Sequence, residues 1–247
     1  AVHALADAAG MAGWLGEKEL AEHWRTLAAS LADAVNARLW NERKRAYTDC
    51  LRGGEQSDVF SQQTQTAAVM SGVAQGERAE RCRAILHDPP DGFVRAGSPF
   101  FEFFLLEAYQ QEGRDRDLIE TIRRDWGFMV DQGATTFWEM WSGRHGRLTR
   151  SHCHGWSAAP TFFLSTWVLG VRPGGPGFGP CIIEPHPGGL AWCRGRVPTP
   201  AGDVAVQWEG PQTGPFALRI EAPDPLELDV RPPRHSTVTV NGTTRDL

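Results

Sequence analysis

The chain has 247 residues, enough for one large domain or two smaller ones. Its 25 Lys and Arg residues against 30 Asp and Glu residues give a net charge of −5, and no basic cluster stands out, which argues against a nucleic acid partner. No apolar run approaches the roughly 18 residues of a membrane span, so no membrane segment is expected.

The residues before Val171 have the spacing of helices. Apolar residues recur at steps of three and four in one stripe, made of Leu20, Trp24, Leu27, Leu31, Val35 and Leu39. A second such stripe runs through 118–130. Further helices are expected near 61–74, 77–87, 99–112 and 157–169. The last of these is apolar nearly all round and is therefore predicted to be buried.

The composition changes near Val171, because thirteen of the seventeen prolines follow that residue. Beyond it the apolar residues alternate with period two, in the sets Val204, Val206, Trp208; Phe216, Leu218, Ile220; Leu226, Leu228, Val230; and Val238, Val240. Gly and Pro turns separate these sets, which predicts an antiparallel β-sandwich. Trp192 and Trp208 lie in predicted strands and are expected in its core. Asn241-Gly242 is a hairpin turn, although few residues remain for its second strand.

The five cysteines are scattered and odd in number, and they are Cys50, Cys82, Cys153, Cys181 and Cys193. They indicate no disulfide framework and favour a reducing, cytoplasmic compartment. The chain opens on Ala1 directly in a helical pattern, without Met. We therefore expect the natural polypeptide to start upstream, and the missing leader says little about export.

The most informative motif is the stretch 133–141, in which Glu139 stands between Trp138 and Trp141. Sugar-cleaving enzymes hold a carboxyl group beside aromatic faces that pack against the C–H surface of a pyranose. A second polar and aromatic cluster, His152-Cys153-His154-Gly155-Trp156, follows closely. The alternative for a lone Trp-Glu-x-Trp is an exposed Glu on an amphipathic helix. The two clusters together favour a carbohydrate site.

Trp138 and Trp141 cannot both face one pocket if they lie on a single helix, where successive residues turn by about 100°. Trp141 is favoured as the sugar platform, with core packing the open alternative, and the constraint vanishes if the segment is a loop. Trp156 and the Phe100/Phe101 pair are further substrate-binding candidates, again with core burial as the alternative. His152 and His154 with Cys153 resemble metal ligands, but zinc sites need three or four ligands and no second cluster stands out. No metal or cofactor is expected.

Many short blocks, in order and spacing, resemble the C-terminal part of the bacterial α-L-rhamnosidases, which belong to the six-hairpin glycosidase class. The blocks are Ser61-Gln62-Gln63 with Ala67-Ala68, Gly97 to Phe101, Trp126 to Met129, Gly133 to Trp141, Ser151 to Ser157, Leu169 to Val171, Pro176 to Phe178 and Val197 to Gly202.

This resemblance implies an α+β multidomain chain: a partial (α/α)6 six-hairpin barrel followed by an antiparallel β-sandwich. Residues 1–170 would form the C-terminal half of the barrel and residues 171–247 the C-terminal β-sandwich domain. The expected helices are fewer than six pairs, and the acidic stretch that supplies the family's general acid has no counterpart here. The missing N-terminal part of the same polypeptide is therefore an expected partner.

The resemblance also implies inverting hydrolysis of terminal α-L-rhamnosides, with a rhamnose-containing glycoside as the substrate. In that reaction one carboxyl protonates the glycosidic oxygen, while a carboxylate roughly 6.5–9.5 Å away activates water. By its position in the motif, Glu139 matches the general base, and His154 is assigned a substrate contact. For His154 the alternative is a histidine that merely caps the following helix.

Two rival functions remain open from the sequence. One is another six-hairpin glycosidase with a different sugar specificity. The other is a non-catalytic carbohydrate-binding remnant, which the lack of an identifiable acid favours for this chain taken alone.

Overall fold

The computed structural model describes residues 1–141, 150–210, 215–233 and 235–246. These residues fall into two compact units, Ala1–Gly97 and Ser98–Leu247. The domain boundary predicted at 170/171 lies within the second unit, and it stays a prediction. Among the described helices, none combines the length and the apolar character needed to cross a bilayer.

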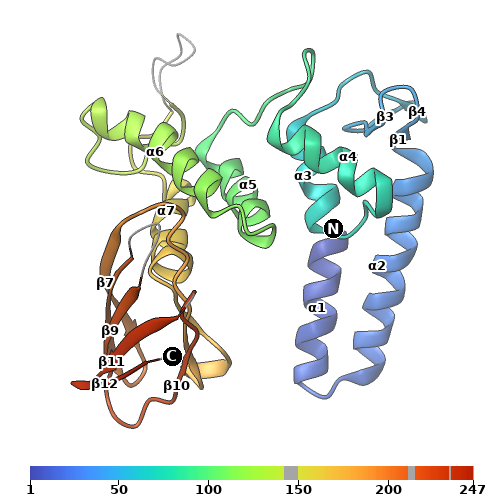
Figure 1. Cartoon of the computed structure of the whole chain (residues 1–247). Coiled ribbons are helices and arrows are strands. Elements are labelled where there is room, and N and C mark those ends of the chain that lie inside the picture. Colours follow the sequence, from blue (N-terminus) through green and yellow to red (C-terminus); the bar gives the residue numbers. More distant parts are fainter. Residues whose placement is uncertain (142–149, 211–214, 234, 247) are drawn as a thin grey trace. The chain divides into compact units, whose positions relative to one another are not determined.

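The first unit contains two helical hairpins. Helices α1 (Val2–Trp14) and α2 (Lys18–Arg38) pack side by side, and α3 (Gln62–Met70) packs against α4 (Gly76–His87) (Figure 1). Small buried side chains, which allow two helix backbones to approach closely, lie along α1 and α2, and they are Ala9, Ala12, Ala21 and Ala28. The predicted stripe on α2 is therefore wrong at Leu20 and Leu27, which are exposed because the buried face passes through the neighbouring alanines.

Two short β-hairpins that were not predicted connect the helical pairs. Strand β1 (Trp40–Asn41) pairs with β2 (Ala46–Tyr47), and β3 (Leu51–Arg52) pairs with β4 (Glu55–Gln56). With only two residues each, these strands are too short to show an alternating pattern in the sequence.

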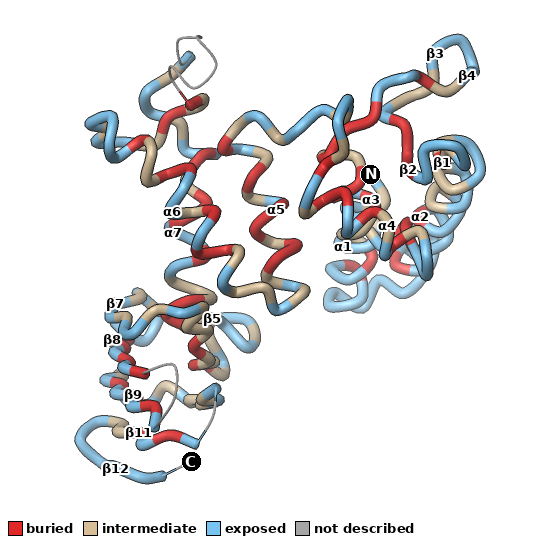
Figure 2. The backbone as a smooth tube through the Cα atoms, turned by 45° about the horizontal axis from the view of Figure 1, so that its top comes forward, coloured by how far each residue is buried: buried red, intermediate tan, exposed pale blue. Residues whose placement is uncertain are grey.

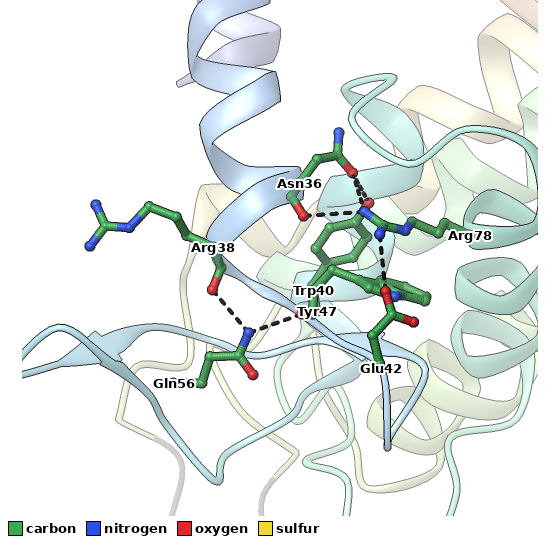
Figure 3. A network of polar contacts seen from close by, with 7 residues as sticks. All are labelled: Asn36, Arg38, Trp40, Glu42, Tyr47, Gln56 and Arg78. Carbon is green, nitrogen blue, oxygen red and sulfur yellow. Dashed lines mark hydrogen bonds and ion pairs between the residues drawn. The ribbon is translucent and has the colours of Figure 1, made fainter.

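Side-chain contacts hold the first β-hairpin against the helices (Figure 3). Arg78 of α4 donates to the Asn36 side chain of α2 at 3.2 Å, and its guanidinium lies 4.7 Å from the ring centre of Trp40. The Tyr47 hydroxyl donates to the same Asn36 side chain. The amide of Gln56 donates to the carbonyl of Trp40 at 2.9 Å. This polar network joins α2, α4 and both β-hairpins within the first unit.

Apart from the strands, the buried residues of the second unit lie mainly on its helices (Figure 2). They are α5 (Pro99–Gln111), α6 (Asp115–Asp131) and α7 (Ala159–Phe163), with the 3-10 turn η1 (Gly155–Ser157) before α7 and the π-helical turn η2 (Leu164–Val168) after it. The helix predicted over 157–169 forms over most of its length, since α7 continues directly into η2 and the two reach from Ala159 to Val168. It is less buried than expected: Phe163 and Val168 are in the core, whereas Phe162 and Leu164 are exposed.

The C-terminal strands form two sheets. One has the strand order β10-β6-β5, made of β5 (Val171–Pro173), β6 (Cys181–Ile183) and β10 (Leu228–Val230), beside the 3-10 turn η3 (Pro176–Phe178). The other has the order β12-β11-β9-β8-β7, made of β7 (Trp192–Thr199), β8 (Gly202–Glu209), β9 (Phe216–Glu221), β11 (Ser236–Val240) and β12 (Thr243–Asp246).

The prediction that all strands pair in antiparallel fashion is wrong, because β6 pairs with β10 in parallel and β9 pairs with β11 in parallel. Long connections that leave the sheet and return make this possible. The Asn241-Gly242 hairpin does form, and β12 is its second strand. The α+β character is confirmed, whereas the partial (α/α)6 barrel and the sandwich packing of the sheets remain predictions.

The period-two sets identify the buried face of the larger sheet correctly at its centre. Val204, Val206, Phe216 and Leu218 are buried. Trp208 is in the core as predicted, and its indole N–H donates to the Val168 carbonyl at 3.1 Å. That bond ties the sheet to the π-helical turn. The prediction for Trp192 is wrong, since its side chain is 60% exposed on strand β7.

Candidate functional site

The two motifs singled out in the sequence lie side by side in the second unit. The backbone N–H of Glu139 donates to the Ser151 carbonyl at 2.9 Å, and the N–H of His154 donates to the Phe137 carbonyl at 2.8 Å. The hydroxyl of Thr136 donates to the carbonyl of His152. Three hydrogen bonds therefore join the segment that carries Glu139 to the segment that carries His154.

The Glu139 segment is a loop rather than a helix. Helix α6 ends at Asp131, and Gly133 follows with a left-handed φ of 80°. The N–H of Gly133 donates to the Val130 carbonyl at 2.9 Å, and the N–H of Ala134 donates to the Met129 carbonyl at 2.9 Å. Glycine favours this conformation at the residue after a helix, because it has no Cβ to clash. The amphipathic-helix alternative for Glu139 is thereby excluded.

Both tryptophans beside Glu139 are packed into the protein. Trp141 is 5% exposed, and its indole N–H donates to the Asp125 carbonyl of α6 at 3.1 Å. Trp138 is 8% exposed, and its ring stacks on His152 with 4.8 Å between centroids. These contacts fix the loop, and they leave Trp141 little surface to offer a sugar in this chain.

His154 is held by a residue of the following turn. Its Nδ1 lies 2.8 Å from the hydroxyl oxygen of Ser157. The carbonyl of the same Ser157 accepts a hydrogen bond from the indole N–H of Trp126 at 2.8 Å. His154 does occupy the residue before η1, but its side chain contacts the Ser157 hydroxyl instead of capping a backbone N–H. The ring is thus positioned through Ser157 from helix α6.

An apolar hollow of ≈ 260 Å³ lies next to this histidine. Its walls are Phe100, Phe103, Phe104, Gly155, Trp156, Ala158, Ala159 and Phe162. Trp156 is 73% exposed, and its ring centre lies 5.7 Å from that of His154 and 5.5 Å from that of Phe100. Phe101 is half-buried against Phe104 with 5.6 Å between centroids, and it is not among the lining residues. Of the aromatic candidates, Trp156 therefore offers the largest exposed face.

A second, more polar hollow of ≈ 470 Å³ lies on the loop itself, lined by Gln132, Gly133, Ala134, Thr135, Thr136, Trp138 and His152. Glu139 is half-buried and is not among the described residues that line either hollow. In the part of the chain that the structure describes, no three His, Cys, Asp or Glu residues gather as a metal site.

Sequence reasoning missed the residues that hold the motif in place. Ser157 orients His154, Thr136 and His152 join the two segments, and the backbone of Asp125 anchors Trp141. The carboxylate of buried Asp125 pairs with Arg124, and this hydrogen bond raises the pKa of the guanidinium. In the sequence, Thr136 and His152 lie within the two motifs and Ser157 directly follows the second, whereas no local pattern points to Asp125.

In a comparison with known proteins, two family models match the chain, one over its helical part and one over its β-rich part. The family model of the bacterial alpha-L-rhamnosidase 6 hairpin glycosidase domain matches residues 1–168. The model of the bacterial alpha-L-rhamnosidase C-terminal domain matches residues 170–245.

Individual proteins that are similar to this chain are also rhamnosidases. The GH78 family rhamnosidase of Bacillus sp. GL1 is 43% identical, with a TM-score of 0.90 over 99% of this chain and 27% of that chain. The rhamnosidase from Klebsiella oxytoca, solved with rhamnose bound, is 27% identical, with a TM-score of 0.55 over 66% of this chain and 32% of that chain. The alpha-L-rhamnosidase of Alteromonas sp. (strain LOR) is 29% identical over 147 residues.

The chain spans only a part of these relatives, namely 27% of the Bacillus enzyme and 16% of the Alteromonas enzyme. The six-hairpin family model nevertheless covers well over half of the chain, from residue 1 to residue 168. The chain therefore belongs to the bacterial α-L-rhamnosidase family, a family of glycoside hydrolases.

Proposed function

We propose that this chain carries the general base of an inverting α-L-rhamnosidase, with Glu139 as the base and His154 as a substrate contact. The observation that carries the proposal is the hydrogen-bonded pairing of the Glu139 and His154 segments, in a chain 43% identical to the Bacillus rhamnosidase. The substrate class rests on the family and on the rhamnose bound to the Klebsiella relative.

In this mechanism Glu139 removes a proton from the water that attacks the anomeric carbon. Glu139 is half-buried in a loop, so its side chain keeps some access to solvent, from which the attacking water comes. His154 is oriented by Ser157 and donates to, or accepts from, a sugar hydroxyl. Trp156, the most exposed ring near His154, packs against the C–H face of the sugar, while Trp138 and Trp141 hold the loop.

The general acid comes from elsewhere in this proposal. The same unit contains two carboxyl groups near the ends of α5 and α6, those of Glu102 and Asp131. Glu102 is buried on α5, and Asp131 is exposed at the end of α6. Neither matches the family's acid, so this proposal places the acid in a part of the relatives' length that this chain does not span.

A chimera tests the proposal directly. This chain replaces the matching C-terminal part of the Bacillus sp. GL1 rhamnosidase, and hydrolysis of p-nitrophenyl α-L-rhamnopyranoside is measured. The first product seen by NMR should be the β anomer, which reports inversion. Activity on another aryl glycoside and none on the rhamnoside would favour the six-hairpin enzyme of different specificity.

Glu139→Gln in that chimera should lower kcat by about 10²–10⁴ with a modest change in KM, because general-base assistance is worth about that factor. His23→Gln, on exposed α2, is the matched control and should leave kcat unchanged. A near-normal rate for Glu139→Gln in a folded, active chimera would remove Glu139 from the mechanism.

A further inference from the structure

The five-stranded sheet has one face in the core and one face in solvent. Strand β7 shows this alternation clearly, with Trp192, Arg194 and Arg196 exposed and the residues between them partly buried. On β8 and β9 the buried positions are the apolar ones. The exposed face is unrelated to the Glu139 loop, and the proposed hydrolysis makes no use of it.

A row of polar side chains crosses this exposed face from one edge of the sheet to the other. The strand register pairs Arg194 with Gln207, Gln207 with Arg219, Arg219 with Thr239, and Thr239 with Thr244. Directly opposed residues place their Cβ atoms about 4.5–5.5 Å apart. Hydrogen-bonding groups from all five strands therefore follow one another in a continuous line.

The row lies in two adjoining hollows. The larger, ≈ 400 Å³, is lined by Arg194, Gly195, Arg196, Ala205, Val206, Gln207, Arg219 and Glu221. The smaller, ≈ 180 Å³, is lined by Gln207, Glu209, Ala217, Leu218, Arg219, Thr237 and Thr239. Gln207 and Arg219 belong to both, so they stand where the two hollows meet. The small side chains of Ala205 and Ala217 keep the face low between the long polar ones.

Two of the three arginines on this face form no ion pair with any described residue. Arg196 lies 3.5 Å from the Asp203 carboxylate, whereas Arg194 and Arg219 have no carboxylate partner in the described ranges. A guanidinium presents a planar fork of donors that matches a carboxylate or a sulfate. Carboxylates of Glu209 and Glu221 also line the two hollows, and Arg196 is paired with Asp203. The positive charge that can meet an anion on this face is therefore confined to the guanidinium groups of Arg194 and Arg219.

An exposed indole continues the face beside the arginines. Trp192 is two residues from Arg194 on the same side of β7, and its register partner is Glu209. Its ring is 60% exposed, although it lies on a strand where a tryptophan usually packs inward. An indole beside hydroxyl, amide and guanidinium donors suits a saccharide, whose rings have apolar C–H faces and polar rims.

We propose that this sheet face, formed by Trp192, Arg194, Gln207, Arg219 and Thr239, binds an acidic saccharide. The anionic groups of the saccharide lie on Arg194 and Arg219, and one of its rings packs on Trp192. The Gln207 side chain donates to Glu209 at 3.0 Å and the Thr239 hydroxyl contacts that of Thr244 at 2.9 Å, so their oxygens accept from saccharide hydroxyls between these points. The face holds the chain on an acidic polysaccharide independently of any hydrolysis.

Isothermal titration of the 247-residue chain tests this at low salt. The probes are an oligogalacturonide, which carries carboxylates, an oligosaccharide of κ-carrageenan, which carries sulfates, and a neutral oligogalactan. The double variant Arg194→Gln/Arg219→Gln should weaken binding of the acidic probes by about tenfold or more, since each charged hydrogen bond contributes substantially. Trp192→Ala should weaken binding of the same probes.

Arg245→Gln is the matched control, because Arg245 lies on the same sheet opposite buried Val238 and so belongs to the other face. It should leave the affinity unchanged, and unaltered melting temperatures show that all variants fold. Binding of either acidic probe that only the face variants lose supports the proposal and identifies the anion.

Three outcomes would overturn the proposal. They are equal binding of the neutral probe, equal loss in Arg245→Gln, and the absence of binding by both acidic probes. Single-stranded DNA that binds as tightly as the saccharides would also overturn it, because the face would then attract any polyanion. Since no hydrolysis is measured, this result stands apart from the fate of the proposed function.

Discussion

His154 is positioned by a residue three places further along the chain. The Ser157 hydroxyl contacts Nδ1, and the Ser157 carbonyl is itself held by Trp126 of α6. The histidine ring is therefore anchored at Nδ1, and in the proposed function its Nε2 contacts the sugar. This arrangement resembles the way many functional histidines are oriented by a hydrogen bond at their second ring nitrogen.

Ser157→Ala removes that hydroxyl and keeps the carbonyl. In the chimera described above, we expect kcat/KM to fall by about tenfold, as the loss of one orienting hydrogen bond implies. His154→Ala should lower kcat/KM further. The double variant should have the same kcat/KM as His154→Ala, because Ser157 acts only through the histidine ring. Steady-state kinetics of the three variants measures this, and additive losses would contradict it.

The cysteines differ sharply in their surroundings. Burial raises the pKa of Cys82 to about 12 and that of Cys181 to about 11, and both side chains are fully buried. Cys153, between the two histidines, is exposed. Because the thiolate is the reactive species, burial and a raised pKa together suppress reaction.

We therefore expect Ellman's reagent at neutral pH to modify Cys153 quickly and to reach Cys82 and Cys181 only after unfolding in guanidinium chloride. Mass spectrometry of the labelled peptides distinguishes the sites. Rapid labelling of Cys82 in the folded chain would show that its surroundings open readily.

At the scale of elements, one cluster joins helix α6 to the segments on either side of the smaller sheet. The indole N–H of Trp167 donates to Asp115 at 2.8 Å, and Nδ1 of His186 lies 3.5 Å from the same carboxylate. The Trp167 and His186 rings stack with 3.5 Å between centroids. Burial acts to raise the pKa of Asp115, but the hydrogen bonds from His186 and Trp167 outweigh it, so the net pKa is lowered.

A carboxyl with a lowered pKa in the folded state stabilises the protein above its unfolded pKa of 3.8, and this contribution is lost as the pH falls through the lower folded value. We expect the urea midpoint to decline below about pH 4. Asp115→Asn should be less stable at pH 7 and should show a smaller decline. Urea titrations followed by tryptophan fluorescence measure both, and identical pH profiles for the two proteins would contradict the assignment.

The strands show how far the sequence alone could go. Alternation identified the buried face that Trp208 shares with Val204 and Val206, the two preceding residues at period-two spacing. It failed at Trp192, because aromatic character suggested the core, whereas the arginines two and four residues further on mark the same side as exposed. The inward side of β7 instead carries Cys193, Gly195 and Val197, and a Cβ added at Gly195 would lie 2.8 Å from Leu169.

The candidate site was predictable as a motif but not as a structure. The residues of 133–141 and 151–157 indicated a sugar site, and the family match bears out the glycosidase class. The exposure of each tryptophan depends on the residue at which α6 ends and on the side chain that reaches the Asp125 carbonyl. Neither feature follows from the local spacing of residues. The parallel strand pairs escaped prediction for a similar reason, since they depend on connections between distant segments.

At the scale of the whole molecule, the chain spans only part of its relatives' length and exposes apolar surface. It covers 27% of the Bacillus enzyme, and large apolar side chains are exposed along its first hairpin, including Met11, Trp14 and Leu15. Exposed apolar surface of this kind marks a face that normally contacts another part of a protein. The two polar hollows of the sheet face need no such partner.

We expect the 247-residue chain alone to hydrolyse p-nitrophenyl α-L-rhamnopyranoside at no measurable rate, since an inverting reaction needs a second carboxyl. It should also bind the dye ANS through its exposed apolar residues, and the chimera should bind less. A colorimetric assay and fluorescence measure these outcomes. Robust turnover by the chain alone would place the acid within its own residues.

The parallel pairing of β6 with β10 affects when the second unit can fold. Cys181 meets Leu228 only across the whole of β7, β8 and β9, so the smaller sheet is incomplete until that stretch has been synthesised. Contacts between distant segments slow folding, because the intervening chain must first be ordered. The helical hairpins of the first unit make their contacts between neighbouring segments of the chain. During synthesis we therefore expect them to fold before the smaller sheet of the second unit, which needs strand β10.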